Sequence, residues 1–104
     1  IAIGSSSRNT PIILRQIGLD TYFDAVADGN AISRSKPDPE VFLLAGSLLG
    51  LAPENCLVVE DADAGVEAAL AGGMRVLGVG GAAKNPKATF AAESLAQLDI
   101  TTVL

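Results

Sequence analysis

The chain has 104 residues, with 7 Lys and Arg against 12 Asp and Glu, a net charge of -5 and no histidine. Without histidine there can be no Ser-His-Asp triad, Cys-His pair or imidazole acid–base catalysis, and the single cysteine excludes an internal disulfide. The acidic balance argues against binding to nucleic acid or to an anionic membrane, whereas a hydrophobic content of 49% predicts a globular domain.

Strand-like apolar runs alternate with helix-like patterns along the chain. Strands are predicted over residues 1–4, 22–27, 55–59 and 75–79. Helices are predicted over residues 11–17, 38–49 and 62–70, each followed by a glycine that suits a helix end. Beyond residue 80 the pattern weakens to a loop over 82–87 and at most a short helix over 93–98. This alternation indicates right-handed βαβ units and a parallel sheet.

The chain opens directly on its first predicted strand, without an initiator methionine. The apolar run at this end is too short for a signal peptide or a membrane span. We therefore expect the chain to be part of a longer protein.

A serine-rich segment, residues 4–9, follows the first predicted strand and leads into a helix. In parallel sheets, ligands bind beyond the carboxyl ends of the strands. Hydroxyls such as those of Ser5 and Ser6, together with backbone N–H groups at a helix start, favour a small oxyanion, above all phosphate. The alternative is a turn that only caps the helix.

Lys36 lies in a segment, residues 35–39, that two prolines stiffen just before a helix. A lysine held in one place is a compact positive charge that suits a phosphoryl group or a nucleophilic carboxylate. The alternative is a solvated lysine in a proline turn.

Glu60 and Asp61 stand at the end of the apolar run that precedes the third predicted helix. Neighbouring carboxylates at a poorly solvated strand end repel each other, and a cation relieves that repulsion. Carboxylate oxygens suit Mg²⁺. The alternative is that Asp61 or Asp63 caps the following helix, although a helix needs only one cap.

Taken in order, these three segments resemble motifs two, three and four of the haloacid dehalogenase superfamily, and most closely its β-phosphoglucomutase-like branch. The resemblance reaches to about residue 81 and is carried by IGSSSRN (3–9), YFDA (22–25), SKPDPE (35–40) and VEDADAG (59–65). It implies an α/β fold with a three-layer, Rossmann-like parallel sheet. Ala62 departs from the pattern, because many relatives carry a serine there.

The resemblance also implies a role for each matching residue. Contacts to phosphate and substrate would come from Ser5, Ser6, Asn9 and Lys36. Lys36 would also be catalytic, because it would neutralise charge between the phosphoryl group and the nucleophile. Asp61 would bind Mg²⁺, with Glu60 beside it as a further ligand or as a partner of the ligands.

Two parts of the family pattern are missing from the 104 residues. The first motif, DxDxT/V, which carries the nucleophilic aspartate, is absent, and so is the helical cap normally inserted after it. Because the strand of that motif is central in the family's sheet, we expect an incomplete sheet with unpaired edges on two apolar strands. Residues 1–104 would then be the carboxyl-terminal portion of a core domain that needs its amino-terminal half or a swapped neighbour.

The function that the resemblance implies is a cytoplasmic, Mg²⁺-dependent phosphotransfer on sugar phosphates through an aspartyl-phosphate. The preferred reaction interconverts β-glucose 1-phosphate and glucose 6-phosphate, and a sugar-phosphate phosphatase is the alternative. Without a nucleophile, the chain by itself is expected to be inactive. A protein of another class, a non-catalytic anion-binding α/β module similar to a receiver domain, would carry its acidic pair earlier in the chain.

Overall fold

The computed structural model describes residues 1–92 of the chain, which form an α/β fold of short alternating strands and helices. The strands are β1 (Ala2–Gly4), β2 (Ala25–Ala27), β3 (Leu57–Glu60), β4 (Arg75–Gly78) and β5 (Phe90–Ala91). The helices are α1 (Thr10–Gln16), α2 (Glu40–Leu48) and α3 (Asp63–Ala71), with 3-10 turns η1 (Pro53–Asn55) and η2 (Gly80–Lys84). The predicted α/β class is confirmed.

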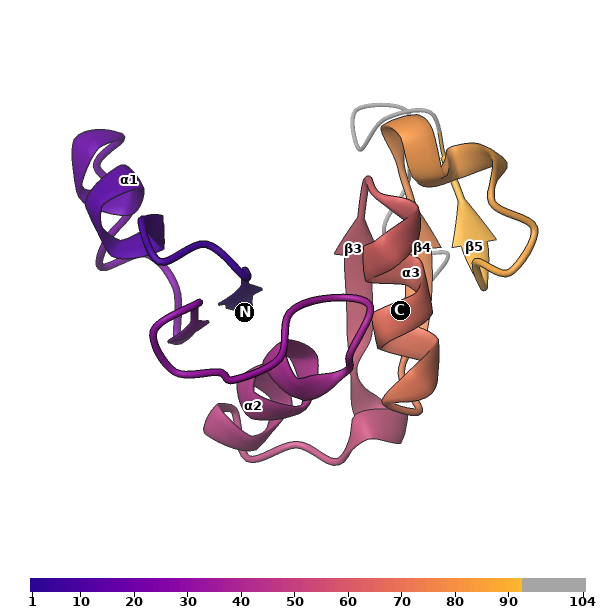
Figure 1. Ribbon diagram of the computed structural model, residues 1–104, viewed down its shortest axis with the longest axis horizontal. Helices are drawn as coiled ribbons and strands as arrows, with labels where there is room; N and C mark the ends of the chain where they lie inside the picture. Colours follow the sequence, from indigo (N-terminus) through magenta and orange to yellow (C-terminus); the bar gives the residue numbers. More distant parts are fainter. Residues whose placement is uncertain (93–104) are drawn as a thin grey trace.

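All strand pairs are parallel, as predicted, but the strands form two separate sheets (Figure 1). In the first sheet β1 pairs with β2, so that Ile3 lies opposite Val26. In the second sheet the order is β3-β4-β5, and Val58 lies opposite Val76. No hydrogen-bonded ladder joins the two sheets within residues 1–92.

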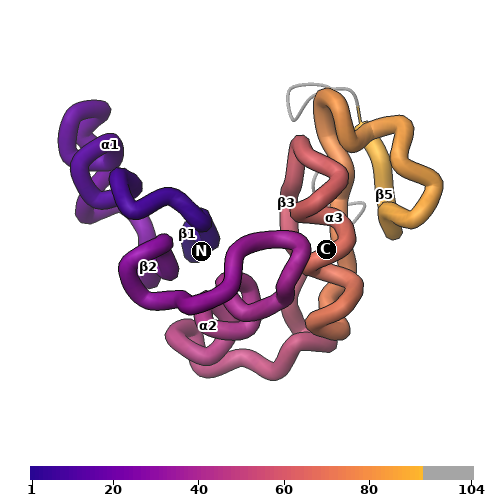
Figure 2. The backbone as a smooth tube through the Cα atoms, in the orientation of Figure 1, coloured from indigo at the N-terminus to yellow at the C-terminus, as the bar shows by residue number. Residues whose placement is uncertain are grey.

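A groove of about 770 Å³ is lined by the facing strands β1 and β3. The tube view places β1 and β2 on one side and β3 on the other, with α2 below them (Figure 2). Phe42, Ala45 and Gly46 of α2 also line the groove. Along it, neither β1 nor β3 has a strand partner among the described residues. The sheet is therefore incomplete between the two strands where an unpaired edge was expected.

The core extends over both sheets, with α2 packed against β1 and β2 and α3 packed against β3 and β4. Its largest fully buried side chains are Val41, Val66, Val76 and Leu77. The alanine-rich helix α3 adds Ala68 and Ala69, both fully buried, and such small side chains allow the helix to approach the sheet closely. The segment that ends in the acidic pair is thus anchored in the core through Val58.

Helix α1 is covered much less than its sequence pattern predicts. The spacing of Ile13, Leu14 and Ile17 predicts an apolar face, but only Leu14 is buried, whereas Ile13 and Ile17 are 48% and 59% exposed. The sheet beside α1 has two strands of three residues each, which offer too little surface to cover the whole face.

The last described part of the chain holds more structure than the predicted loop over residues 82–87. It contains η2 and the two-residue strand β5, which is too short for any alternation to mark it. The helix predicted over residues 93–98 lies outside the described residues. Within residues 1–92, none of the helices has the length and apolar character needed to cross a membrane.

Two side-chain contacts tie the loop after η2 to α3. Lys87 Nζ lies 2.8 Å from Glu67 Oε1, and Asn85 Nδ2 donates to Asp63 Oδ1 at 3.0 Å. The hydrogen bond from Lys87 to Glu67, together with the charge of Glu67, raises the pKa of Lys87 above its ordinary value. Because both side chains of this ion pair are about half exposed, water screens it and its contribution to stability is small.

A lysine whose pKa is raised by folding stabilises the fold below its ordinary pKa of 10.5, and this stabilisation is lost as the pH rises through the higher folded value. We expect the NMR titration midpoint of Lys87 to fall when Glu67→Gln removes the carboxylate. In urea unfolding, the difference between the wild type and Lys87→Gln should be present at neutral pH and vanish above the folded pKa. An identical Lys87 midpoint in both proteins would contradict this interpretation.

Candidate active site

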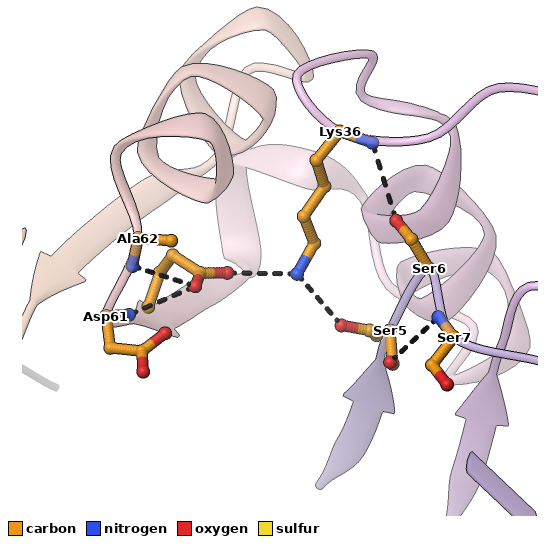
Figure 3. A network of polar contacts seen from close by, with 8 residues as sticks. Ser5, Ser6, Ser7, Lys36, Asp61 and Ala62 are labelled. Atoms are coloured by element: carbon orange, nitrogen blue, oxygen red, sulfur yellow. Dashed lines mark hydrogen bonds and ion pairs between the residues drawn. The ribbon is translucent and has the colours of Figure 1, made fainter. Parts of the chain in front are cut away.

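The three polar segments singled out in the sequence meet at the carboxyl ends of β1 and β3. Lys36 reaches from its loop across to the end of β3, between Ser5 and Ser6 on one side and Asp61 and Ala62 on the other (Figure 3). The two sheets thus contribute to one site. Its centre is an ion pair in which Lys36 Nζ lies 3.0 Å from Glu60 Oε2.

Lys36 is held by several groups and is not a freely solvated surface lysine. Its side chain is 20% exposed, and its ammonium lies 4.7 Å from the centre of the Phe42 ring. Nζ also donates to the Gly4 carbonyl at 3.3 Å, and the Lys36 backbone N–H lies 3.4 Å from Ser6 Oγ. A partly desolvated ammonium interacts more strongly with nearby anions than one in bulk water.

Glu60, at the end of β3, is 9% exposed and uses both carboxylate oxygens. Oε1 accepts the backbone N–H groups of Asp61 and Ala62 at 3.0 and 3.1 Å, and Oε2 faces Lys36. Glu60 therefore fixes the turn into α3 and neutralises the half-buried Lys36 at the same time. Its predicted role towards Mg²⁺ stays a prediction.

The serine hydroxyls shape the loop after β1. Ser5 Oγ accepts the N–H of Ser7 at 3.2 Å, and Ser7 Oγ accepts the N–H of Asn9 at 3.1 Å. These bonds shape the turn, but the alternative of a helix cap is not what the structure shows, because α1 has no side-chain cap hydrogen bond within residues 1–92. A hydroxyl that accepts one bond still has its own hydrogen to donate, and among the described residues the Ser5 hydrogen has no acceptor. Ser5 can therefore shape the turn and bind an anion.

Gly29 packs against the backbone of this loop. Its backbone N–H donates to the Ser7 carbonyl at 3.0 Å, and a Cβ at this position would lie 2.3 Å from the Ser6 carbonyl oxygen. Asn9, at the start of α1, is exposed, and its side chain makes no hydrogen bond within residues 1–92. The structure therefore places Asn9 beside the loop without bringing it into the ion-pair network.

Asp61 differs from Glu60 because its carboxylate is exposed and makes no hydrogen bond among the described residues. It is therefore available to a cation. In residues 1–92 no group of three or more possible ligands comes together, so Asp61 and Glu60 do not form a complete metal site by themselves. A magnesium ion takes six oxygen ligands, several of which are commonly water, and the carboxylate of Asp61 suits one of them.

Gly65 leaves the space that the Glu60 side chain occupies. It is buried in α3, and a Cβ at this position would lie 2.0 Å from both Cδ and Oε2 of Glu60. Sequence reasoning did not identify Gly65 as part of the site. The available signal was a glycine inside a helix pattern, which costs stability and so suggests a close contact.

We expect Gly65→Ala to lower the free energy of unfolding by about 1–3 kcal/mol, because the new methyl group overlaps the Glu60 carboxylate. In an unhindered helix the same change would be stabilising, so the direction of the effect is informative. Urea denaturation measures it. In a Glu60→Ala protein the methyl group has room, so Gly65→Ala should lower the free energy of unfolding by less. Equal costs on both backgrounds would rule out the proposed contact.

Comparison with known proteins places this site in a family. Residues 1–73 match the model of the haloacid dehalogenase-like hydrolases. The chain is 42% identical over 80 residues to β-phosphoglucomutase of Bacillus subtilis (strain 168), covering 77% of this chain and 35% of that protein. It is 40% identical over 79 residues to fructose-1-phosphate phosphatase YqaB of Escherichia coli (strain K12), covering 76% of this chain and 42% of that protein.

Solved structures agree with the sequence matches. The crystal structure of β-phosphoglucomutase from Clostridium difficile matches with a TM-score of 0.90 and 34% identity, over 99% of this chain and 46% of that chain. A phosphatase from Thermococcus onnurineus matches with a TM-score of 0.85 and 26% identity, over 97% of this chain and 49% of that chain. This chain thus spans less than half the length of each relative. On these matches, the chain belongs to the haloacid dehalogenase superfamily, in its β-phosphoglucomutase-like branch.

Proposed function

We propose that this chain is part of a Mg²⁺-dependent phosphotransferase that acts on sugar phosphates through an aspartyl-phosphate. The observation that supports the proposal best is the meeting of Lys36, Glu60 and the serine loop at one edge of the fold. Phosphoryl transfer depends mainly on positioning and on charge neutralisation, which a fixed ammonium and nearby hydroxyls supply. The relatives named as a sugar-phosphate mutase and a sugar-phosphate phosphatase point to the same class.

In this proposal the serine loop and Lys36 bind the transferring phosphoryl group. Ser5 donates its hydroxyl hydrogen to a phosphoryl oxygen, and Ser6 and Asn9 bind the phosphate or the substrate beside it. Lys36 is the catalytic residue of this chain, because its ammonium neutralises charge between the phosphoryl group and the attacking carboxylate. Glu60 keeps that ammonium in place through the 3.0 Å ion pair.

Asp61 and Glu60 are the residues that would hold Mg²⁺. The exposed carboxylate of Asp61 fits the preference of the ion for oxygen ligands, and the remaining ligands would come from water, substrate and groups outside residues 1–92. When bound, the ion neutralises charge on the phosphoryl oxygens. Glu60 already uses both oxygens, so we assign the direct contact to Asp61 and the neighbouring position to Glu60.

The nucleophilic aspartate of the proposed reaction does not come from these 104 residues, which lack a DxDxT/V sequence. We propose that it is carried by a strand that fills the groove between β1 and β3, supplied by an amino-terminal half or by a swapped neighbour. The groove is lined by both strands and by Lys36, so a strand placed there would end beside the ammonium. The chain alone is then inactive.

The preferred reaction is the interconversion of β-glucose 1-phosphate and glucose 6-phosphate, which the similarity to the mutases of Bacillus subtilis and Clostridium difficile supports. The similarity to fructose-1-phosphate phosphatase favours a sugar-phosphate phosphatase as the second candidate. Because the chain belongs to this superfamily, no observation favours the alternative of a receiver-like binding module.

The proposal predicts that the chain binds inorganic phosphate and Mg²⁺ at separable positions of one site. We expect Lys36→Ala to weaken phosphate binding about tenfold or more, a loss of about 1.4 kcal/mol. Asp61→Ala should weaken Mg²⁺ binding by a similar factor. Titrations followed by the backbone amide signals of residues 5–9 and 60–62 measure both affinities.

The controls are Arg75→Ala, at the exposed amino end of β4, and Asp20→Ala, at an exposed position after α1; each removes a charge of the same sign away from the site. Neither control should alter the affinities. The proposal fails if Lys36→Ala and Asp61→Ala change only the free energy of unfolding and leave both affinities unchanged. Mg²⁺-dependent turnover of β-glucose 1-phosphate by the purified chain would contradict the predicted inactivity.

A further inference from the structure

The loop that carries Lys36 is restrained differently on the two sides of this residue. Pro37 and Pro39 restrict the backbone on the carboxyl side of Lys36. The amino side, residues 31–35, has no proline, and the Lys36 backbone contact to Ser6 Oγ is long, at 3.4 Å. Asp38 holds part of this side, since its N–H donates to the Ser35 carbonyl at 3.0 Å, but its 3.8 Å contact to the exposed Arg34 guanidinium is screened by water.

Glu40, the first residue of α2, also holds the amino side of the loop. Its Oε1 accepts the backbone N–H of Ser33 at 2.7 Å, and its Oε2 accepts the backbone N–H of Arg34 at 3.1 Å. The Ser33 hydroxyl lies 3.3 Å from both oxygens. The Glu40 carboxylate thus links the start of α2 to Arg34 and Ser33, which lie six and seven positions earlier in the chain.

The anchor is attached to a rigid part of the molecule. The two residues that follow Glu40, Val41 and Phe42, are buried in the core, at 0% and 7% exposure. The Glu40 backbone N–H donates to Asp38 Oδ1 at 3.0 Å, so the start of the helix is itself fixed. Hydrogen bonds from backbone N–H groups to a carboxylate are stronger than those between neutral groups.

We propose that Glu40 is a positioning residue for Lys36. Within residues 1–92 Glu40 makes no hydrogen bond to Ser5, Ser6 or Lys36, so it acts through the loop and not by contact with the phosphate site. It holds the amino side of the loop while the prolines hold the carboxyl side. The functional part of this inference rests on the proposed role of Lys36 in binding a phosphoryl group.

Competitive acylation of lysines, read by mass spectrometry, tests the proposal directly. The chain has three lysines, and Lys84 and Lys87 serve as internal references for Lys36. In Glu40→Ala we expect the labelling rate of Lys36 relative to Lys84 to rise about threefold or more, because the side chain is no longer held at 20% exposure. Glu40→Gln, which keeps one acceptor oxygen, should give an intermediate rise.

The control variant is Glu54→Ala, which removes an exposed carboxylate in η1 that makes no side-chain hydrogen bond within the described residues. It should leave the Lys36 ratio unchanged. Urea unfolding reports whether each variant is folded, and Glu40→Gln decides the question if Glu40→Ala does not fold. An unchanged Lys36 ratio in a folded Glu40 variant would overturn the proposal.

A parallel titration with inorganic phosphate separates this inference from the proposed function. If Glu40 positions Lys36 for phosphate, the affinity should fall several-fold in Glu40→Ala and partly recover in Glu40→Gln. A rise in labelling with unchanged phosphate affinity would overturn the positioning role. If the wild type binds no phosphate but Lys36 labelling still rises, the proposed function fails and the anchoring of the loop by Glu40 stands.

Discussion

The ion pair between Lys36 and Glu60 connects the two halves of the described structure. Lys36 follows the first sheet in the chain and Glu60 ends a strand of the second, and no strand ladder joins the sheets within residues 1–92. Removing one member of a fully buried pair costs about 3–5 kcal/mol, because the other charge is left without a partner, and the cost is smaller for this pair because the Lys36 side chain is 20% exposed. Here the two backbone N–H groups that Glu60 accepts would offset part of that cost.

The ion pair and the serine loop beside it each depend on a close approach that only glycine permits. Gly65 allows the Glu60 carboxylate to lie against α3, and Gly29 allows the turn after β2 to lie against the serine loop. Neither glycine needs an unusual backbone angle, because neither has a positive φ. A glycine is needed at each position because a neighbouring group occupies the space that a side chain would fill. The charged centre is therefore built on packing at positions that carry no chemistry themselves.

Much of the site was predictable because it follows from chain order. Ser5 and Glu60 stand at strand ends and Lys36 lies in the loop that leads into α2, and parallel topology brings such positions together. The contacts of Glu40 and Gly65 were not predictable from the sequence. They depend on the conformations of two carboxylate side chains, those of Glu40 and Glu60. The exposure of Ile17 was missed for a different reason: periodicity predicts an apolar face but not whether anything covers it.

The groove between β1 and β3 also bears on how this chain behaves in solution. Each strand presents a row of N–H and C=O groups to the groove, and such groups pair with any extended segment whatever its side chains. The segment that we propose to fill the groove and a second copy of this chain would therefore compete for the same edges. If that segment is present, the edges are paired and the chain should self-associate less.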